Sequence, residues 1–414
     1  RGETEVSEIP SQTTAVLAEG SKFPSLFLEY YEKHKQRLVP EFLDHFEQGT
    51  LTESSRETLR RFALSDQVQE AVNGAFDEVR LERARMRNLQ QKARARIDEL
   101  TANPDKAQED AALEIKEAES SHKMLGRLFA EQGKRYPLNV LTDAGVLPNY
   151  AFPEPGVELQ SVVGVGDGDD RRYEAFTYVR PASAAIRELA PGNYFYAEGR
   201  RVRVDEIDLG SATQSLVEGW RLCASCNHAE RDEGDATPVS GCPACGDDRW
   251  TDVGQRRKLV YFRRSRSLAT RLESASSDDG EERRKVFFQT HDLIDVLKEN
   301  CCGARLIEEL PFGFELLTGL KLREVNYGLD SGDAQTSSEF AGKKLSGDGF
   351  KVCKDCGRVW SGDRQEPIKH SSTCRTKRGR AEQTEAVFLY REVESEAIRL
   401  LLPIAELDLE VQQA

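Results

Sequence analysis

The sequence predicts an α+β protein: an N-terminal helical bundle with a long helical hairpin, then a small β-rich, barrel-like domain and two zinc-binding modules. Three observations support this prediction. Before residue 135 the apolar residues recur at helical spacing, and from residue 136 short β-branched and aromatic runs replace them. Two cysteine clusters then have the spacing of zinc ligands.

Composition narrows the classes of protein to which the chain can belong. With 414 residues, 38 % of them hydrophobic and no apolar run of membrane-spanning length, we expect a soluble protein of several domains. A net charge of −14 argues against a uniformly basic nucleic-acid-binding protein, although local basic clusters matter more. Seven of the nine cysteines fall in the two clusters, which favours zinc in the reducing cytoplasm over disulfides. A start at Arg1 without a signal-like segment favours a processed chain or a piece of a longer protein.

The helical region is predicted to cover residues 21–135, after a polar connector over residues 1–20. Phe23, Leu26, Phe27 and Tyr30 lie at i, i+3, i+4 and i+7, which is one helical face, and Pro40 suits the first turn of a second helix. Residues 54–132 are helical in pattern and broken at 103–104 by Asn-Pro, so an antiparallel hairpin is expected. The seven basic residues between 80 and 96 indicate either a solvated helix face or a nucleic-acid contact.

The β-rich domain is predicted to cover residues 136–270. Strands are expected over "VELQSVVGV", "YEAFTYV", "NYFYA" and "RRVRVDEI", with a hairpin turn at "VGVGDGDD" and a helix over "ASAAIRELA" that ends at Pro191–Gly192. Residues 271–283 form an expected acidic flexible loop. The remaining region, 284–414, is predicted to be a mixed α/β zinc-binding region, with "THDLIDVLKEN" helical, residues 305–328 in strands and residues 328–349 flexible. Its last residues, 396–414, begin an amphipathic element.

The first cysteine cluster predicts a zinc ribbon over residues 220–250. Two Cys-x2-Cys pairs stand fifteen residues apart, so that two knuckles close a tetrahedral cage of four thiolates; its ligands are Cys223, Cys226, Cys242 and Cys245. A redox dithiol or an iron–sulfur cluster lacks a supporting motif, and His228 is expected to be a bystander. Because four protein ligands leave no open position for water, the predicted role is structural.

The second cluster predicts another structural zinc site, between residues 353 and 374. Three thiolates and one imidazole are its expected ligands: Cys353, Cys356, His370 and Cys374. The alternative, unpaired thiols beside a surface histidine, does not explain four ligands at zinc spacing. Cys301 and Cys302 are adjacent, which suits a disulfide poorly, and we expect both to be buried small hydrophobic residues.

A basic run follows the first cluster and is the predicted nucleic-acid contact. It has no acidic residue and is interleaved with Tyr261 and Phe262, which would add stacking to phosphate contacts. The alternative is a solvated strand face balanced by the acidic loop that follows. The residues predicted to contact DNA are Arg256, Arg257, Lys258, Arg263, Arg264 and Arg266.

Motifs for catalysis are missing from the sequence. It contains no phosphate-binding loop, no nucleophile elbow and no His-Glu-x-x-His pattern, and we therefore predict no catalytic residue in this chain.

Residues 136–414 resemble the region that follows the ATPase lobes in superfamily 2 DEAD/DEAH-type DNA helicases with an MrfA-like zinc-binding C-terminal domain. The resemblance lies in "LPNYAFP" (147–153), in residues 180–207, in the four-cysteine ribbon and in "EAVFLYREVESEAIRLLLP" near the end. Among these helicases it is most similar to that of the DISARM phage-defence system. The family's final cysteine cluster is not visible here.

The resemblance implies ATP-driven movement on DNA, work in antiviral defence or repair, and a partner protein with a related zinc-binding domain. The motor motifs are absent, so ATP and magnesium would bind only to motor domains outside this sequence. We therefore expect a zinc-stabilised accessory region that guides single-stranded DNA or a duplex end and docks the partner, and no membrane association. The alternative is a non-enzymatic protein-interaction scaffold with structural zinc modules.

Overall fold

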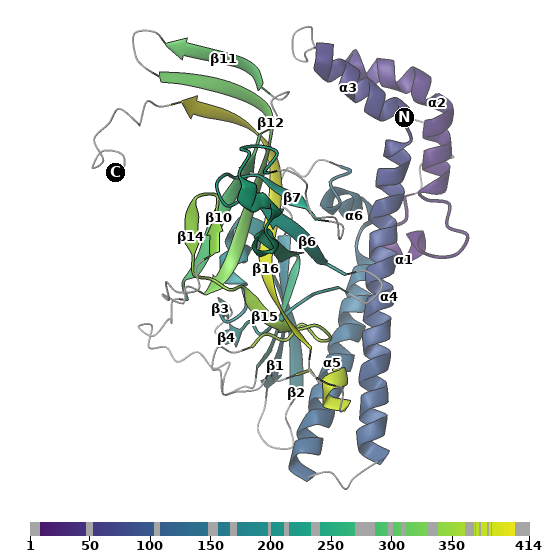
Figure 1. Cartoon of the computed structure of the whole chain (residues 1–414). Coiled ribbons are helices and arrows are strands. Elements are labelled where there is room, and N and C mark those ends of the chain that lie inside the picture. The colour runs from purple at the N-terminus through teal and green to yellow at the C-terminus, as the bar shows by residue number, and fades with distance from the viewer. Residues whose placement is uncertain are drawn as a thin grey trace. The chain divides into compact units, whose positions relative to one another are not determined.

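The chain divides into a helical unit, Arg1–Pro155, and a β-rich unit, Gly156–Ala414. The computed structural model (Figure 1) describes residues 9–46, 53–102, 108–147, 156–165, 172–197, 200–210, 215–232, 241–269, 286–296, 301–307, 312–329, 338–360, 368, 370–371, 374–378, 381 and 383–401. We predicted boundaries after residues 135 and 270. In the structure residues 136–147 belong to the helical unit, and the described strands before and after residue 270 belong to one unit. The predicted acidic loop at 271–283 and the phrase at 148–153 lie outside the described residues.

The helical unit contains the predicted long hairpin (Figure 1). Its helices are α1 (Thr13–Val16), α2 (Ser25–Leu43), α3 (Glu53–Leu64), α4 (Gln67–Ala102), α5 (Gln108–Lys134) and α6 (Pro137–Asp143). Three contacts show that α4 and α5 are antiparallel, because the residue numbers fall on one helix as they rise on the other: Arg83 to Phe129, Gln90 to His122 and Arg96 to Glu114. The prediction of an antiparallel hairpin is therefore confirmed.

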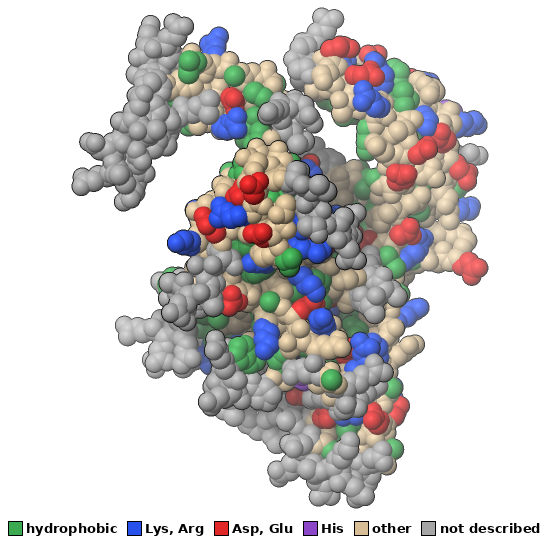
Figure 2. Space-filling model, in the orientation of Figure 1, with side chains coloured by type: hydrophobic (Ala, Val, Ile, Leu, Met, Phe, Trp, Pro, Cys, Tyr) green, Lys and Arg blue, Asp and Glu red, His purple; other side chains and the backbone are tan. Residues whose placement is uncertain are grey.

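Some of the seven basic residues between 80 and 96, which lie on α4, make contacts within this hairpin. Arg83 donates to the carbonyl of Phe129 and lies 3.7 Å from the centre of its ring, while Arg87 approaches the same ring. Arg96 is buried and pairs with Glu114 of α5 at 2.9 Å. Figure 2 shows basic and acidic side chains interspersed over the helices on the visible face, as expected for a solvated surface.

Two sequence predictions in this unit are wrong. Pro40 does not begin a second helix but lies inside α2. The helix continues past it because Val39 and Leu43, one turn apart, are both buried on the same face, and this packing outweighs the one backbone bond that Pro40 cannot donate. Residues 1–20 are not all connector: α1 packs into the unit, and both the amide and the hydroxyl of Thr13 donate to the carbonyl of Arg135.

The β-rich unit contains two main sheets. The smaller has the order β2-β1-β9-β5 and the larger the order β10-β12-β16-β8-β6-β7, with β11 added to β12 and β15 to β16. The pairs β1–β9 and β16–β8 are parallel, and the others are antiparallel. The strands are β1 (Gly156–Val165), β2 (Arg172–Pro181), β5 (Glu206–Ile207), β6 (Val217–Leu222), β7 (Ala229–Arg231), β8 (Arg256–Tyr261), β9 (Arg264–Ala269), β10 (Phe288–Asp295), β11 (Cys301–Ile307), β12 (Phe312–Leu329), β15 (Phe350–Cys353) and β16 (Thr384–Leu401).

Two hairpins and several short helices complete the β-rich unit. The hairpins are β3 (Tyr194–Ala197) with β4 (Arg200–Arg203), and β13 (Ser338–Phe340) with β14 (Lys343–Leu345). The helices are α7 (Ala182–Glu188) and the 3-10 turns η2 (Asp248–Thr251), η3 (Val253–Gln255) and η6 (Arg375–Arg378). The predicted strands at 157–207, the antiparallel pairing of β1 with β2 and the helix before Pro191 are confirmed. The predicted turn between β1 and β2 lies mostly outside the described residues.

The β-rich unit differs from the sequence prediction in three respects. Within the described residues both main sheets are open rather than closed into a barrel, because their strand orders end in unshared edges. Residues 288–295 form strand β10 instead of a helix, since alternate side chains such as His291 and Leu293 are buried against the sheet. Residues 338–345 form the β13–β14 hairpin instead of a flexible segment.

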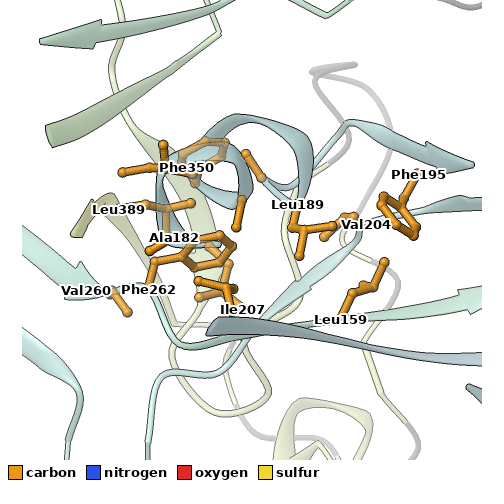
Figure 3. Packing of buried hydrophobic residues seen from close by; sticks show 14 of the residues in the cluster. Leu159, Ala182, Leu189, Phe195, Val204, Ile207, Val260, Phe262, Phe350 and Leu389 are labelled. Atoms are coloured by element: carbon orange, nitrogen blue, oxygen red, sulfur yellow. The ribbon is translucent and has the colours of Figure 1, made fainter. Parts of the chain in front are cut away.

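The larger core lies where α7 and the two main sheets meet. Figure 3 shows Leu189, Ile207 and Phe262 converging with side chains from several strands, and the same cluster contains Leu159 of β1 and Leu389 of β16. Leu159 and Leu389 lie more than two hundred positions apart in the sequence, so the core joins both halves of the β-rich unit. A second cluster on the larger sheet contains the stacked rings of β12 and β13.

Candidate metal centres

The first cluster brings together all four predicted thiols. The sulfur atoms of Cys223, Cys226, Cys242 and Cys245 lie within 4.8 Å of one another. The Sγ–Sγ distance is 3.6 Å between Cys223 and Cys245 and 3.7 Å between Cys226 and Cys242. A tetrahedral zinc ion with Zn–S bonds of about 2.3 Å requires sulfurs about 3.8 Å apart, whereas a disulfide requires about 2.05 Å. The donor set and its spacing therefore fit zinc.

Short backbone bonds shape each knuckle of this cluster. In the first, the amide of Cys223 donates to the carbonyl of His228, and the amide of Ser225 donates to the sulfur of Cys223. In the second, the amide of Gly246 donates to the carbonyl of Cys242. Gly246 has a φ of +80°, a conformation that favours glycine. The second knuckle is therefore a tight turn in which Gly246 supplies the left-handed conformation.

Side chains hold the two knuckles together and onto the sheet. Arg249 pairs with Asp247 at 2.9 Å and with Glu339 of β13 at 2.9 Å, and it also donates to the Ser225 hydroxyl. These bonds, with Arg249 the largest cause, lower the pKa of Asp247 to about 2. Next to them the amide of Ala341 donates to the carbonyl of Cys223. The β13–β14 hairpin is therefore part of the support of the first cluster.

His228 is not one of the four ligands. Its ring centre lies 5.2 Å from that of Trp250, and its Nε2 lies 3.5 Å from a carboxylate oxygen of Glu230. Trp250 is buried against Cys223 and Cys242 and shields one side of the cluster.

The second cluster combines three thiols and one imidazole, as predicted. Cys353, Cys356, His370 and Cys374 place their ligand atoms within 4.8 Å of one another. The Sγ–Sγ distance between Cys353 and Cys374 is 3.8 Å, and Nδ1 of His370 lies 3.6 Å from Cys356 and 3.5 Å from Cys374. A tetrahedral zinc ion with bonds of about 2.3 Å to sulfur and about 2.0 Å to nitrogen requires these spacings.

The knuckle of the second cluster is bonded to β5. The amide of Gly357 donates to the carbonyl of Cys353, which closes the turn. On its outer side the amide of Ile207 donates to the carbonyl of Gly357 at 2.9 Å. Arg358, the next residue, pairs with Asp205 and Glu206 at 2.5 and 3.1 Å. The knuckle thus joins the edge of the four-stranded sheet.

The burial of both clusters favours neutral thiols unless a cation is bound. Burial raises the pKa of the thiols of Cys223, Cys226, Cys356 and Cys374, because a thiolate is poorly solvated there. The exposed Cys245 differs: the backbone amide of Asp247 lowers the pKa of its thiol. A divalent ion offsets the cost of burying several thiolates, and with four protein ligands it keeps no position for substrate. The two clusters can stabilise the fold, but they do not provide a Lewis-acid site for substrate.

The predicted nucleic-acid residues lie on β8, on β9 and in the short connection between them, and several are paired with acids. Arg256 pairs with Asp232 at 2.8 Å and Lys258 with Glu385 at 2.6 Å. Arg266 pairs with Glu206 at 2.7 Å. These acids come from other strands or loops, so the cations cross-link the unit.

The remaining members of the basic run have different surroundings. Arg264 lies between Glu158 of β1 and Asp208, at 3.2 and 3.4 Å. Arg257 is more than half buried, which lowers the pKa of its guanidinium, and it lies 4.8 Å from the centre of the Phe340 ring. Arg263 is exposed and lies over the ring of Tyr261 at 5.1 Å. DNA contact by this run stays a prediction, and Arg263 is one of its exposed members.

Cys301 and Cys302 do not form a buried apolar pair. Cys301 is partly exposed and Cys302 is exposed. Neighbouring residues of a strand point to opposite faces of the sheet, and the pairing of β11 with β12 contains a bulge between Cys301 and Gly303. Both are free thiols, outside the two clusters.

Sequence reasoning missed a second group of cations and aromatic rings. On the β3–β4 hairpin, Tyr194 and Tyr196 alternate with Phe195, and Arg201 and Arg203 alternate with a buried valine. The signal was the alternation in "NYFYA" and "RRVR", which places Tyr194, Tyr196, Arg201 and Arg203 on the face opposite to Phe195 and Val202.

The chain matches no protein-family model, no curated protein and no solved structure. The resemblance to zinc-domain helicases therefore stays a prediction. Within the described residues, no helix combines the length and the apolar character needed to cross a membrane.

Proposed function

We propose that this chain is the zinc-stabilised accessory region of an ATP-dependent DNA helicase or translocase, which guides DNA and docks a partner protein. The observation that carries the proposal is the completeness of both ligand sets: four protein ligands at zinc spacing, each set bonded to strands or hairpins of the sheets. Closed sites of this kind stabilise binding modules rather than catalyse reactions. Among the described residues these are the two groups of three or more side chains that fit a metal ion.

The DNA part of the proposal rests on the helicase resemblance and on exposed cations beside aromatic rings. ATP and magnesium would act in motor domains outside this sequence. A role in antiviral defence and a partner with a related zinc-binding domain follow from the same resemblance.

Two measurements test this proposal. Metal analysis of the purified chain should return about two zinc ions per molecule. Fluorescence anisotropy should show binding of single-stranded or duplex-end DNA that weakens as salt rises, because phosphate contacts release counterions. Zinc near zero, or no salt-dependent DNA binding by the zinc-loaded chain, would contradict it.

The basic run can be tested separately through Arg263, one of its exposed members. Arg263→Ala removes a cation that lies over Tyr261. If β8 and β9 lie on the DNA path, this variant should bind DNA several-fold more weakly with a shallower salt dependence. Unchanged binding would remove Arg263 from the path without affecting the proposal for the whole chain.

A second candidate function is a protein-interaction scaffold without DNA contact. It is favoured by the net charge of −14 and by the acid pairing of Arg256, Lys258, Arg264 and Arg266. Copurification at fixed stoichiometry with a partner protein, together with no DNA binding at low salt, would support this function instead.

A further inference from the structure

The β3–β4 hairpin has two chemically distinct faces. In its antiparallel register Tyr194 lies opposite Arg203 and Tyr196 lies opposite Arg201, with Phe195 opposite a valine between them. Directly opposite residues share a face, so both tyrosines and both arginines lie on one side. We call these four residues the Tyr–Arg face. It carries two aromatic rings and two cations, whereas the other side carries the apolar pair Phe195 and Val202.

The apolar side holds the hairpin rigidly on the core. Phe195, Val202 and Val204 are buried in the larger core cluster, and Figure 3 shows Phe195 and Val204 beside Leu159 and Leu189. At the base of the hairpin, the side-chain amide of Asn193 donates to the last carbonyls of α7 at 3.1 Å. The Tyr–Arg face is therefore held in place before any ligand binds, which lowers the entropic cost of binding.

Arg201 has surroundings unlike those of Arg264 and Arg266 in the basic run. Its guanidinium lies 5.2 Å from the centre of the Tyr194 ring. Within the described part of the chain it forms no ion pair with a carboxylate, and its Nε has no hydrogen-bond partner. Arg264 and Arg266, by contrast, are each paired with acids of other strands. Among Arg201, Arg264 and Arg266, Arg201 is therefore the one whose charge no acid of the described residues balances.

We propose that the Tyr–Arg face binds single-stranded nucleic acid, with Tyr194 and Tyr196 stacking on bases and Arg201 and Arg203 contacting phosphates. This proposal rests on the proposed function and narrows the DNA contact to one surface. Aromatic rings that alternate with cations are the combination by which proteins bind single strands without reading their sequence. A duplex keeps its bases stacked inside, so the rings would favour single strands over duplex.

The stacking contribution is tested by substitution of the tyrosines in the full chain. Tyr194→Leu and Tyr196→Leu keep apolar bulk but remove the ring, and each should weaken binding of a labelled oligo-dT by about tenfold. Tyr196→Phe keeps the ring and should bind like the unaltered chain. Parallel titrations with oligo-rU distinguish DNA from RNA as the strand that is preferred.

The phosphate contribution is tested by paired charge removal. Arg201→Ala with Arg203→Ala should make the salt dependence shallower, by about 1.4 in the slope of log affinity against log salt. Lys343→Ala with Lys344→Ala removes the same charge from the β14 strand and should leave the slope unchanged. Zinc content and circular dichroism check that each variant is folded. Tyr196→Phe serves as the control for a substitution in the hairpin that should leave binding unchanged.

The outcomes separate this inference from the proposed function. If the chain binds oligo-dT but the leucine and alanine variants bind equally well, the Tyr–Arg face is not the site and the proposed function stands. If the unaltered chain binds duplex ends but no single strand at any salt concentration, this inference fails and the proposed function stands; if it binds neither, both fail. Equal, ring-dependent binding of a poly-glutamate peptide would show an acidic protein partner and would overturn the nucleic-acid assignment.

Discussion

The amide of Ile207 donates a hydrogen bond to the carbonyl of Gly357, which joins the edge strand β5 to the turn of the second metal centre. The two residues are 150 positions apart in the sequence, yet their backbones lie so close that no side chain fits on Gly357. The metal centre is therefore continuous with the four-stranded sheet. Loss of the turn should disturb both.

Gly357→Ala should destabilise the β-rich unit. Gly357 has a φ of +72°, and an added Cβ would overlap the carbonyl oxygen of Ile207. We expect a loss of roughly 3 kcal/mol or more in unfolding free energy, measured by urea denaturation. The control is Gly192→Ala, which has a φ of +88° but open space around the added Cβ. It should cost only about 1–2 kcal/mol. Equal losses in the two variants would show that the close contact has no effect.

Removal of one ligand should empty one metal centre and leave the other. Cys374→Ser should lower the zinc content from about two ions per chain to about one, because Cys374 is a buried ligand of the second cluster. It should also lower the thermal midpoint. Cys302→Ser changes an exposed thiol outside both clusters and should keep about two ions. Metal analysis after gel filtration measures both, and two ions in the Cys374 variant would exclude Cys374 as a ligand.

Glu324→Gln should be strongly destabilising. The Glu324 carboxylate is buried and accepts from Arg187 of α7 at 2.5 Å and from Arg391 of β16 at 2.8 Å. The neutral amide removes the buried negative charge that balances Arg391, whose side chain is only 11 % exposed, and this costs about 3 kcal/mol. Glu394→Gln also breaks an ion pair, with Lys321 at 2.9 Å, but at an exposed site, and should change stability by less than about 1 kcal/mol. Similar effects in chemical denaturation would contradict the assigned difference in burial.

The buried imidazole of His291 should make stability depend on pH. Burial, with the charge of Lys343, lowers the pKa of His291 below its usual value of about 6.5. The unfolded chain therefore binds this proton more readily than the folded chain. The contribution of His291 is fully present above pH ~6.5 and is lost as the pH falls from there through the lowered folded pKa.

His291→Leu should flatten the stability profile of the chain between pH 8 and pH 5. Unfolding free energies of variant and unaltered chain, compared at each pH, cancel contributions that both share, including those of the metal ligands. Parallel profiles for the two proteins would show that His291 does not titrate differently on folding.

The metal centres could be predicted from the sequence because a zinc knuckle is local. Cys223 and Cys226, or Cys353 and Cys356, are brought together by a turn of a few residues, and the spacing alone indicates that turn. The helical hairpin could also be predicted from the sequence, since its periodicity and the break at residues 103–104 are properties of short segments.

The larger sheet could not be predicted in the same way. Residues 290–295 contain polar and apolar side chains in a pattern that suits either a helix or a strand. They form a strand because they pair with β12. The β13–β14 hairpin is small and polar, and it is ordered where it contacts the first zinc knuckle. In both cases the deciding partner lies far away in the sequence.

The ion pairs of the basic run could not be predicted either, because their acidic partners also lie far away in the sequence. Lys258 meets Glu385, 127 residues later, and Arg264 meets Glu158, 106 residues earlier. The absence of acids inside the run therefore does not indicate an unbalanced surface. Charge counted along the chain gave no information about charge balance across strands.

Strand β16 has a consequence for how the protein is made. It lies between β12 and β8 in the larger sheet, and it also pairs with β15. Until a ribosome has released residue 401, β8 and β12 have no central neighbour and their hydrogen-bonding edges are open. Such edges invite pairing with other chains, so nascent or shortened forms that lack β16 should need chaperones and should aggregate when these are scarce.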